Sequence, residues 1–196
     1  MVIAFVMLAA LFWLMLPIGV PQPAKHPAVG RPSPAFDLVQ LIPGAQSGAD
    51  AEPATFVGLP DGGSVTLLHF WGTWCPPCKL EYPELIEMAS EFGAEPRFRF
   101  VTVSCGGGGA EDYESLRSQT ERYYRTIDAG QLETFADLAG ATRSEVASVL
   151  GDSMVYPTTV LIGSDGRIAG VWLGYSPSGV AEMRSLIVEL LGQAAI

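Results

Sequence analysis

The sequence predicts an α/β fold in which a mixed central sheet is flanked by helices, and three observations support this. The stretch "VTLLHFW" (65–71) is a continuous apolar run of strand length, typical of a strand buried on both faces. Expected strands alternate with expected helices through the middle of the chain, which indicates parallel crossover units. Two later apolar runs flank the turn Ser164-Asp165-Gly166 and predict an antiparallel hairpin. The 196 residues suffice for one domain plus a tail.

The N-terminal stretch (1–20) differs in kind from the rest. "MVIAFVMLAALFWLMLPIGV" carries no charged side chain, and about 20 apolar residues are enough to cross a bilayer as a helix. No basic residue precedes the run, the following "VPQP" is a poor cleavage site, and no cysteine follows for lipoprotein processing. We therefore expect a transmembrane anchor or uncleaved signal, rather than a buried core helix.

Between this anchor and the expected domain (35–196) lies a proline-rich segment, "PQPAKHPAVGRPSP" (21–34). Proline at this density predicts a stiff, extended spacer that holds the domain off the membrane. Lys25 and Arg31 follow the span, and the positive-inside rule would favour a cytoplasmic domain. The cysteine chemistry described below favours the outside, and we follow it.

The first half of the domain contains three expected strands and one long helix. "AFDLVQL" (35–41) alternates as a short strand, and residues 43–64 carry little signal beyond a loop. After the strand at 65–71, Pro76–Pro77 suit a first helical turn, because no hydrogen bond is lost there. This helix should run to about Phe92 with a kink at Pro83, followed by the strand "RFRFVTVSC".

The second half begins with a glycine run (106–109) and a polar, tyrosine-bearing helix. "LETFADL" predicts a short strand and "RSEVASVL" a short helix, followed by hairpin strands at 159–162 and 168–173. A last helix, capped by Ser176-Pro177, closes the chain. Its apolar residues fall on one face: Val180, Met183, Ile187 and Leu190.

Charge and cysteine content exclude several classes of function. The net charge of −10 argues against nucleic-acid binding, which depends on Lys and Arg contacts to phosphate. Three cysteines are too few for a disulfide scaffold, and the odd number leaves one to explain.

Cys75 and Cys78 stand two residues apart in "FWGTWCPPCKLEYPEL", a spacing that fits several kinds of site. Structural zinc needs four ligands, and haem attachment needs a histidine where Lys79 stands. Copper would find only His69 nearby, and a purely structural disulfide at this spacing constrains little. We therefore expect no metal and no cofactor.

Redox chemistry fits the pair better. Cys75 should lie where a buried strand ends and a helix begins, and the helix dipole there lowers the pKa of a thiol. Cys78, one turn along and more buried, could then attack a mixed disulfide formed by Cys75. The sequence therefore predicts a dithiol/disulfide redox site.

"FWGTWCPPCKLEYP" resembles the active site of thioredoxin-fold proteins, specifically the TlpA/ResA-like family of membrane-anchored thiol-disulfide oxidoreductases. "YPTT" with "VLIGSDGRIAGVWLGY" resembles the later segment of that family, and "VGRPSPAFDL" its entry segment. The likeness spans roughly 29–191, with poor matches after Leu41 and after Cys105. It implies a thioredoxin-like fold, preceded by one N-terminal transmembrane helix.

The resemblance also implies roles for individual residues. Cys75 would be the attacking thiol and Cys78 the resolving one, forming a redox-active disulfide. Pro157 would be a cis-proline facing the cysteines, with the backbone of Tyr156 pairing with an extended substrate. Gly174 would leave room for the backbone of that substrate. Trp71 and Trp74 flank the motif, either as substrate contacts or as core packing.

Each of three further residues has two possible roles. Glu81, one turn beyond Cys78, could exchange a proton with that thiol, or it could be an exposed helix glutamate. His69 departs from the family, whose members carry an aspartate or a neutral polar residue there. It could accept a proton from Cys78, or be a hydrogen-bonded core histidine, which we favour. Cys105 could be a third redox thiol, or a small buried residue at a strand end, which we also favour.

The function expected from these observations is reduction of disulfides in exported proteins, with an extracytoplasmic (periplasmic-side) domain. The resemblance implies a thiol-transferring membrane protein as electron donor, and apocytochrome c as one client in cytochrome c maturation. The alternatives are a thiol peroxidase, an oxidant of opposite polarity, and a non-enzymatic metal- or copper-binding module.

Overall fold

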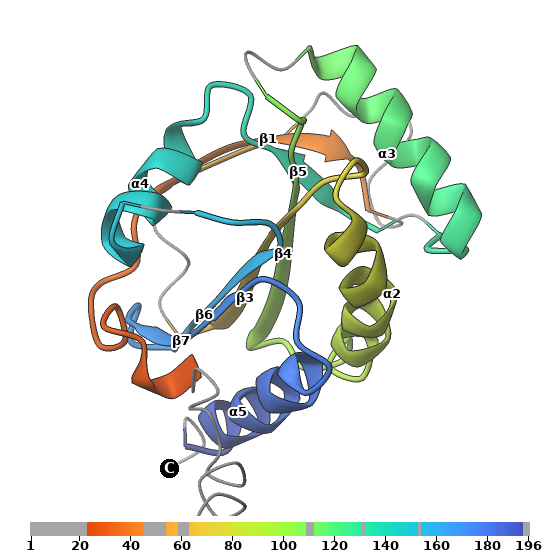
Figure 1. The fold of residues 1–196 in the computed structure, drawn as a ribbon. Helices are drawn as coiled ribbons and strands as arrows, with labels where there is room; N and C mark the ends of the chain where they lie inside the picture. The colour runs from red at the N-terminus through yellow and green to blue at the C-terminus, as the bar shows by residue number, and fades with distance from the viewer. Residues whose placement is uncertain are drawn as a thin grey trace, which may run out of the picture.

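The computed structural model describes residues 23–44, 54–58, 63–108, 112–130, 132–152 and 154–193 of the chain. In these residues seven strands form one sheet in the order β2-β1-β5-β4-β3-β6-β7 (Figure 1). The strands are β1 (Phe36–Ile42), β2 (Thr55–Gly58), β3 (Val65–Trp71), β4 (Phe98–Ser104), β5 (Thr134–Ala136), β6 (Thr158–Ile162) and β7 (Ile168–Leu173). The helices are η1 (Pro23–Lys25), α2 (Pro76–Ser90), α3 (Tyr113–Ile127), α4 (Ala141–Leu150) and α5 (Gly179–Gln193).

Strand β3 lies inside the mixed sheet, between β4 and β6, which explains its continuous apolar run. It pairs in parallel with β4 and antiparallel with β6, and all seven of its residues are buried. A strand covered on both faces has no solvent side on which to place polar residues. The predicted mixed α/β fold is confirmed.

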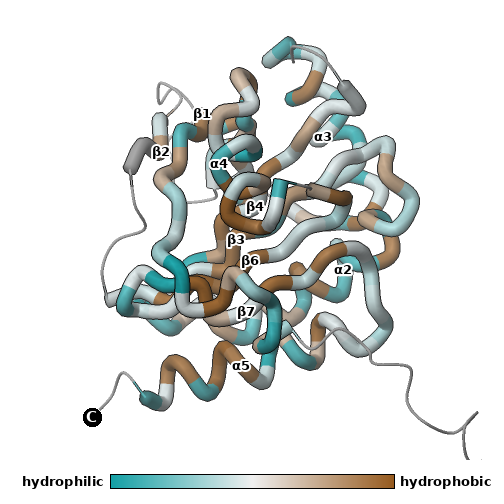
Figure 2. Tube along the Cα trace, turned by 60° about the vertical axis from the view of Figure 1, so that its left-hand side comes forward, coloured by the Kyte–Doolittle hydropathy of each residue, from teal (hydrophilic) through white to brown (hydrophobic). Residues whose placement is uncertain are grey.

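Helices cover both faces of the sheet. On one face α4 packs through Val146 and Leu150 against β3 and β6, and on the other α2 and α5 pack against the alternate residues of the same strands. Figure 2 shows α5 alternating between hydrophobic and hydrophilic residues along its length. Val180, Met183 and Ile187 of its predicted apolar face are buried, which holds α5 beside α2.

Two elements differ from the sequence-based expectations. Strand β2 lies within residues 43–64, which we expected to be a loop, and pairs antiparallel with β1 as an edge strand. Four residues are too few to show a periodic pattern, so the pairing creates the strand. Helix α5 begins at Gly179 and not at Ser176-Pro177, because these residues form a preceding turn in which the Gly179 amide donates to the Ser176 carbonyl (2.9 Å).

The proline-rich segment, described from Pro23 onward, lies against the domain. The Gly30 amide donates to the Ile168 carbonyl (2.8 Å), and the Ile168 amide to the Arg31 carbonyl (2.9 Å). Ala28 is buried in the core beside β7. From about Ala28 this segment therefore belongs to the folded surface and does not extend as a spacer.

The anchor predicted at 1–20 lies outside the described residues. Within the part of the chain that the structure describes, no helix combines the length and the apolar character needed to cross a bilayer.

Candidate redox site

The two cysteines lie where β3 gives way to α2. Cys75 is the N-cap residue of the helix, with extended backbone dihedrals, and its sulfur accepts a hydrogen bond from the Cys78 amide (3.3 Å). Pro76 and Pro77 occupy the first helical turn, as predicted, because the amides there have no helical partner to lose. The Cys78 amide and the positive end of the α2 dipole therefore point at the sulfur of Cys75.

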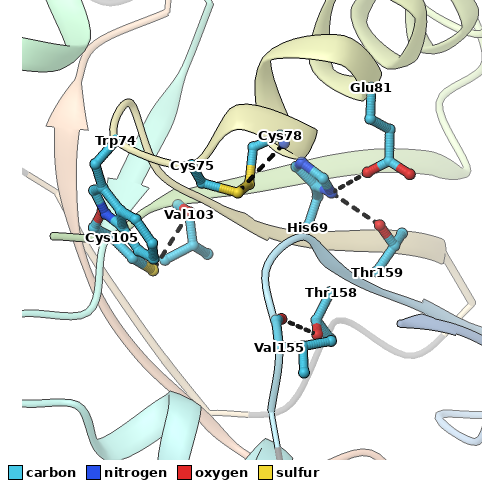
Figure 3. The surroundings of a disulfide bond; sticks show 10 residues. All are labelled: His69, Trp74, Cys75, Cys78, Glu81, Val103, Cys105, Val155, Thr158 and Thr159. Atoms are coloured by element: carbon cyan, nitrogen blue, oxygen red, sulfur yellow. Dashed lines mark hydrogen bonds and ion pairs between the residues drawn. A yellow bond between two sulfur atoms is a disulfide. The ribbon is translucent and has the colours of Figure 1, made fainter. Parts of the chain in front are cut away.

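Cys75 and Cys78 are joined by a disulfide, with sulfur atoms 2.14 Å and Cα atoms 5.3 Å apart (Figure 3). Both residues are buried, with Cys75 exposing 2% of its surface and Cys78 none. The structure therefore represents the oxidised form of the pair.

The Tyr156–Pro157 peptide bond is cis, as the resemblance implied. The Gly174 amide donates to the Pro157 carbonyl (2.8 Å), which ties the end of β7 to the cis-proline turn. Gly174 has φ +76°, a conformation that favours glycine, and a Cβ there would meet nothing within 4 Å. Backbone conformation alone therefore accounts for this glycine.

An aromatic group flanks the disulfide on its solvent side. Trp74 is 45% exposed, and its ring packs edge-on against Tyr156 with centroids 5.2 Å apart. Its indole N–H donates to the Cys105 carbonyl (2.9 Å), and a Cβ on Gly72 would collide with the indole. Trp71, by contrast, is fully buried and stacks on Tyr82, so it belongs to the core.

Cys105 lies behind this aromatic group and is fully buried, as we favoured. The phenol of Tyr156 lies beside its thiol, and burial first, then Cys105, raises the pKa of Tyr156 to about 12. Arg143 donates to the Tyr156 hydroxyl (3.4 Å) and pairs with the buried Asp137 (3.2 Å). Sequence reasoning missed Arg143 on α4 and Asp137 in the loop before it, since nothing local in "ADLAGATR" indicates a contact with Tyr156.

A polar cluster lies on the opposite, interior side of the disulfide. His69 of β3 and Glu81 of α2 are both buried, with His69 Nδ1 3.7 Å from Glu81 Oε2. Thr159 of β6 lies directly opposite His69 in the strand register, and its hydroxyl oxygen is 2.8 Å from the same Nδ1. Figure 3 shows the imidazole and the Glu81 carboxylate turned toward each other near the disulfide.

The positions of Glu81 and His69 decide between structural alternatives that the sequence left open for each residue. Glu81 is 1% exposed, so the exposed helix glutamate is wrong. His69 is a hydrogen-bonded core histidine, as favoured, and it also faces an ionisable partner. Sequence reasoning missed Thr159, because only the antiparallel register of β3 and β6 brings it opposite His69.

Burial displaces the pKa values of both ionisable groups toward their neutral forms. It raises the pKa of Glu81 to about 7, with a smaller contribution from the negative charge of Glu84. It lowers the pKa of His69 to about 3. Near neutral pH, therefore, the imidazole is uncharged and the carboxyl is at the midpoint of its titration.

Within the described residues, no group of three or more His, Cys, Asp or Glu side chains is arranged to hold a metal ion. Nδ1 of His69 faces Glu81 and Thr159, and the nearby cysteines are joined to each other.

A mixed sheet, a disulfide at the start of α2 and a cis-proline beside it define a protein of the thioredoxin class. A family model described as Thioredoxin-like matches residues 62–168, more than half of the chain. The chain belongs to this family.

Comparison with curated proteins gives relatives within the same class. The chain is 31% identical to the thiol:disulfide interchange protein DsbE of Pseudomonas aeruginosa over 40% of this chain and 47% of that protein. It is 27% identical to the thiol-disulfide oxidoreductase ResA of Bacillus subtilis, over 57% of this chain and 54% of that one. The matches to the first three relatives span 44–47% of their lengths, a little under half.

Solved structures show the same fold at low sequence identity. A thiol:disulfide interchange protein of Chlorobium tepidum superposes with a TM-score of 0.58 at 20% identity, covering 89% of this chain and 100% of that one. StoA of Bacillus subtilis gives a TM-score of 0.53 at 21% identity, covering 81% and 99%.

Proposed function

We propose that this protein is a thiol–disulfide oxidoreductase that reduces disulfides in exported proteins through Cys75 and Cys78. The observation that carries the proposal is the position of the disulfide: at the N-terminus of α2, beside a cis-proline, with a buried carboxyl one turn further along. The names of relatives, thiol:disulfide interchange protein and thiol-disulfide oxidoreductase, support the same activity.

The proposed reaction begins with both cysteines reduced. The Cys75 thiolate attacks one sulfur of a client disulfide, and the second client sulfur leaves as a thiolate. Cys75 is thereby joined to the client in a mixed disulfide. The dipole of α2 favours the thiolate form of Cys75 that this attack requires.

The second step resolves the mixed disulfide. Cys78 gives its proton to the Glu81 carboxylate and attacks the sulfur of Cys75, which releases the remaining client sulfur as a thiolate. The product is the Cys75–Cys78 disulfide, the form of the protein described here. A dithiol electron donor, which we propose to be a membrane protein, returns the pair to its reduced form.

An exposed apolar rim supports a protein client. Trp74, Val155 and Leu173 are each 44–48% exposed and come from the three segments that surround the disulfide. The backbone of Tyr156, next to the cis bond, would pair with an extended client segment, and Gly174 would admit its backbone. Apolar side chains gathered around a reactive sulfur favour an unfolded or extended polypeptide as substrate.

The cellular setting is part of the same proposal. Residues 1–20 would anchor the protein in the membrane, residues 21–34 would connect the anchor to the domain at 35–196, and that domain would lie on the periplasmic side. Disulfides persist outside the cytosol, where a reductase has substrates. Apocytochrome c is one client that the family resemblance suggests.

The test is a redox titration of the full-length protein in a series of glutathione buffers, followed by tryptophan fluorescence and thiol trapping. We expect a two-electron transition below about −220 mV, on the reducing side of common redox proteins. A value near −120 mV would reverse the assigned direction of electron flow and make the protein an oxidant. No transition in the wild type, with an unchanged result in Cys75→Ser, would remove the redox proposal altogether.

A further inference from the structure

The interior side of the disulfide contains an ionisable pair in which each member has a buried polar atom without a hydrogen-bond partner among the described residues. These atoms are Nε2 of His69 and Oε2 of Glu81, and both side chains are at most 1% exposed. Buried polar atoms are nearly always hydrogen-bonded, so two such atoms within one cluster require an explanation. The cluster lies beside Cys78, whose sulfur carries no proton in the oxidised form.

The contacts of His69 determine which ring nitrogen carries the proton. Nδ1 has the Thr159 hydroxyl at 2.8 Å and Glu81 Oε2 at 3.7 Å, whereas Nε2 has no partner. An orphaned buried N–H is rarer than an orphaned acceptor, so the proton belongs on Nδ1. The Nδ1–H group then donates to Thr159 and is directed at the same time toward the carboxyl of Glu81.

We propose that His69 is a positioning residue that holds the Glu81 carboxylate, through its Nδ1–H, ready to receive the proton of Cys78. This rests on the proposed function, and it assigns to His69 a role in the second step only. When Cys78 attacks Cys75, the S–H bond of Cys78 breaks, its electron pair forms the new S–S bond, and its proton passes to Glu81. His69 keeps its own proton throughout.

The groups that face the His69–Glu81 pair come from α2, β6 and α5. From α2, Tyr82 stacks over the imidazole (centroids 5.6 Å apart) and Glu84 adds negative charge near Glu81. From β6 the facing group is Thr159, and from α5 it is Gly179, where a Cβ would lie 4.0 Å from Glu81 Oε1. The nitrogen that faces the Glu81 carboxyl is the Nδ1 of His69, 3.7 Å from Oε2. Removing the Nδ1–H should therefore destabilise the carboxylate and move its ionisation to higher pH.

The experiment follows single turnovers of the reduced full-length protein with glutathione disulfide between pH 5 and 9. Acid quenching and mass analysis separate the Cys75–glutathione mixed disulfide from the final Cys75–Cys78 disulfide. His69→Phe keeps a ring against Tyr82 and removes Nδ1. We expect it to slow resolution about tenfold at pH 7, because the carboxylate loses the N–H dipole that faces it, and to shift the pH inflection upward by about one unit.

His69→Asn is the matched variant, because its amide N–H can replace Nδ1–H while Nε2 is lost. We expect it to resolve within about threefold of the wild type, with the mixed disulfide forming at the same rate in all three proteins. Resolution by His69→Phe at the wild-type rate and pH profile overturns the proposal, and so does an equal loss in both variants. In these cases the proposed function stands, whereas it fails if the wild type forms neither disulfide.

A second measurement does not depend on how the variants fold. The chain has two histidines, so ¹⁵N NMR of the wild type resolves His69 from His26. We expect the neutral Nδ1–H tautomer of His69 in the oxidised protein at pH 7. A proton on Nε2 would contradict the proposal.

Discussion

The two sides of the Cys75–Cys78 disulfide differ in solvent access and in chemistry. On one side Trp74 is nearly half exposed and packs against Tyr156, on the other His69 and Glu81 are sealed inside the domain (Figure 3). In the proposed reaction, a client reaches the first side from solvent. The proton of Cys78 can be controlled only on the second, because burial there raises the pKa of Glu81 to about 7. We infer that, in the proposed reaction, capture and resolution of the client take place on opposite sides of one disulfide.

Replacing each cysteine in turn should distinguish capture of the client from resolution of the mixed disulfide, and it has the largest expected effect. Cys75→Ser removes the attacking sulfur, so turnover with a protein disulfide should be lost. Cys78→Ser leaves capture intact but removes the resolving sulfur, so a stable mixed disulfide should accumulate. Non-reducing electrophoresis and mass analysis distinguish these outcomes, and an adduct in Cys75→Ser would contradict the assigned order.

Glu81→Gln should impair the interior side alone. The amide keeps the shape of the side chain but cannot accept a proton, so the resolving step should slow about 100-fold at pH 7. Glu87→Gln is the control, since Glu87 lies on the same helix but is exposed. Rapid-quench kinetics measure both steps. Equal slowing of capture and resolution would contradict a role of Glu81 in the resolving step alone.

The interior pair also predicts an unusual dependence of stability on pH. Between about pH 4.5 and 6.5 the unfolded pair holds one proton, on His69, and the folded pair also holds one, on Glu81, since their folded pKa values are about 3 and about 7. Equal proton counts give no slope. The free energy of unfolding should therefore be insensitive to this pair until the pH falls below about 4.5, where only the unfolded state takes up a second proton.

Single variants should reveal the opposing slopes. In His69→Asn the raised pKa of Glu81 remains, so stability is full below pH 4.5 and falls by roughly 3 kcal/mol as the pH rises through about 7. In Glu81→Gln the lowered pKa of His69 remains, so stability is full above pH 6.5 and falls toward pH 3. Urea unfolding of the oxidised proteins, compared with the double variant, measures both. Parallel curves for the two single variants would refute the coupling.

The sequence predicted the exposed side of this comparison better than the interior side. The cysteine motif, Pro157 and Trp74 stand in local patterns that could be recognised without a structure. The partnership of His69 with Thr159 depends on the register of two strands that are 90 residues apart. Burial of Glu81 likewise depends on the packing of α5 beside α2, which no local pattern specifies.

Trp74→Ala should weaken the client side without affecting proton transfer. Losing a half-exposed indole beside the disulfide should lower kcat/KM for a protein client about tenfold, mainly through KM. Val188→Ala on α5 is the control, since that side chain is similarly exposed at 51%. Single-turnover resolution should keep its wild-type pH profile, and a shifted inflection would mean that the two sides are not independent.

Cys105→Ala should have the smallest effect, and it tests whether the third thiol takes part in the chemistry. The thiol is fully buried, and Trp74 is held by the backbone carbonyl of Cys105, which the substitution retains. Arg143 also continues to donate to the Tyr156 hydroxyl, so the aromatic group keeps its other contacts. We expect turnover within about twofold of the wild type, because the contacts that position Trp74 and Tyr156 do not depend on the Cys105 sulfur. A tenfold loss of turnover, or a disulfide that includes Cys105 in quenched samples, would instead show that the Cys105 thiol takes part in the reaction.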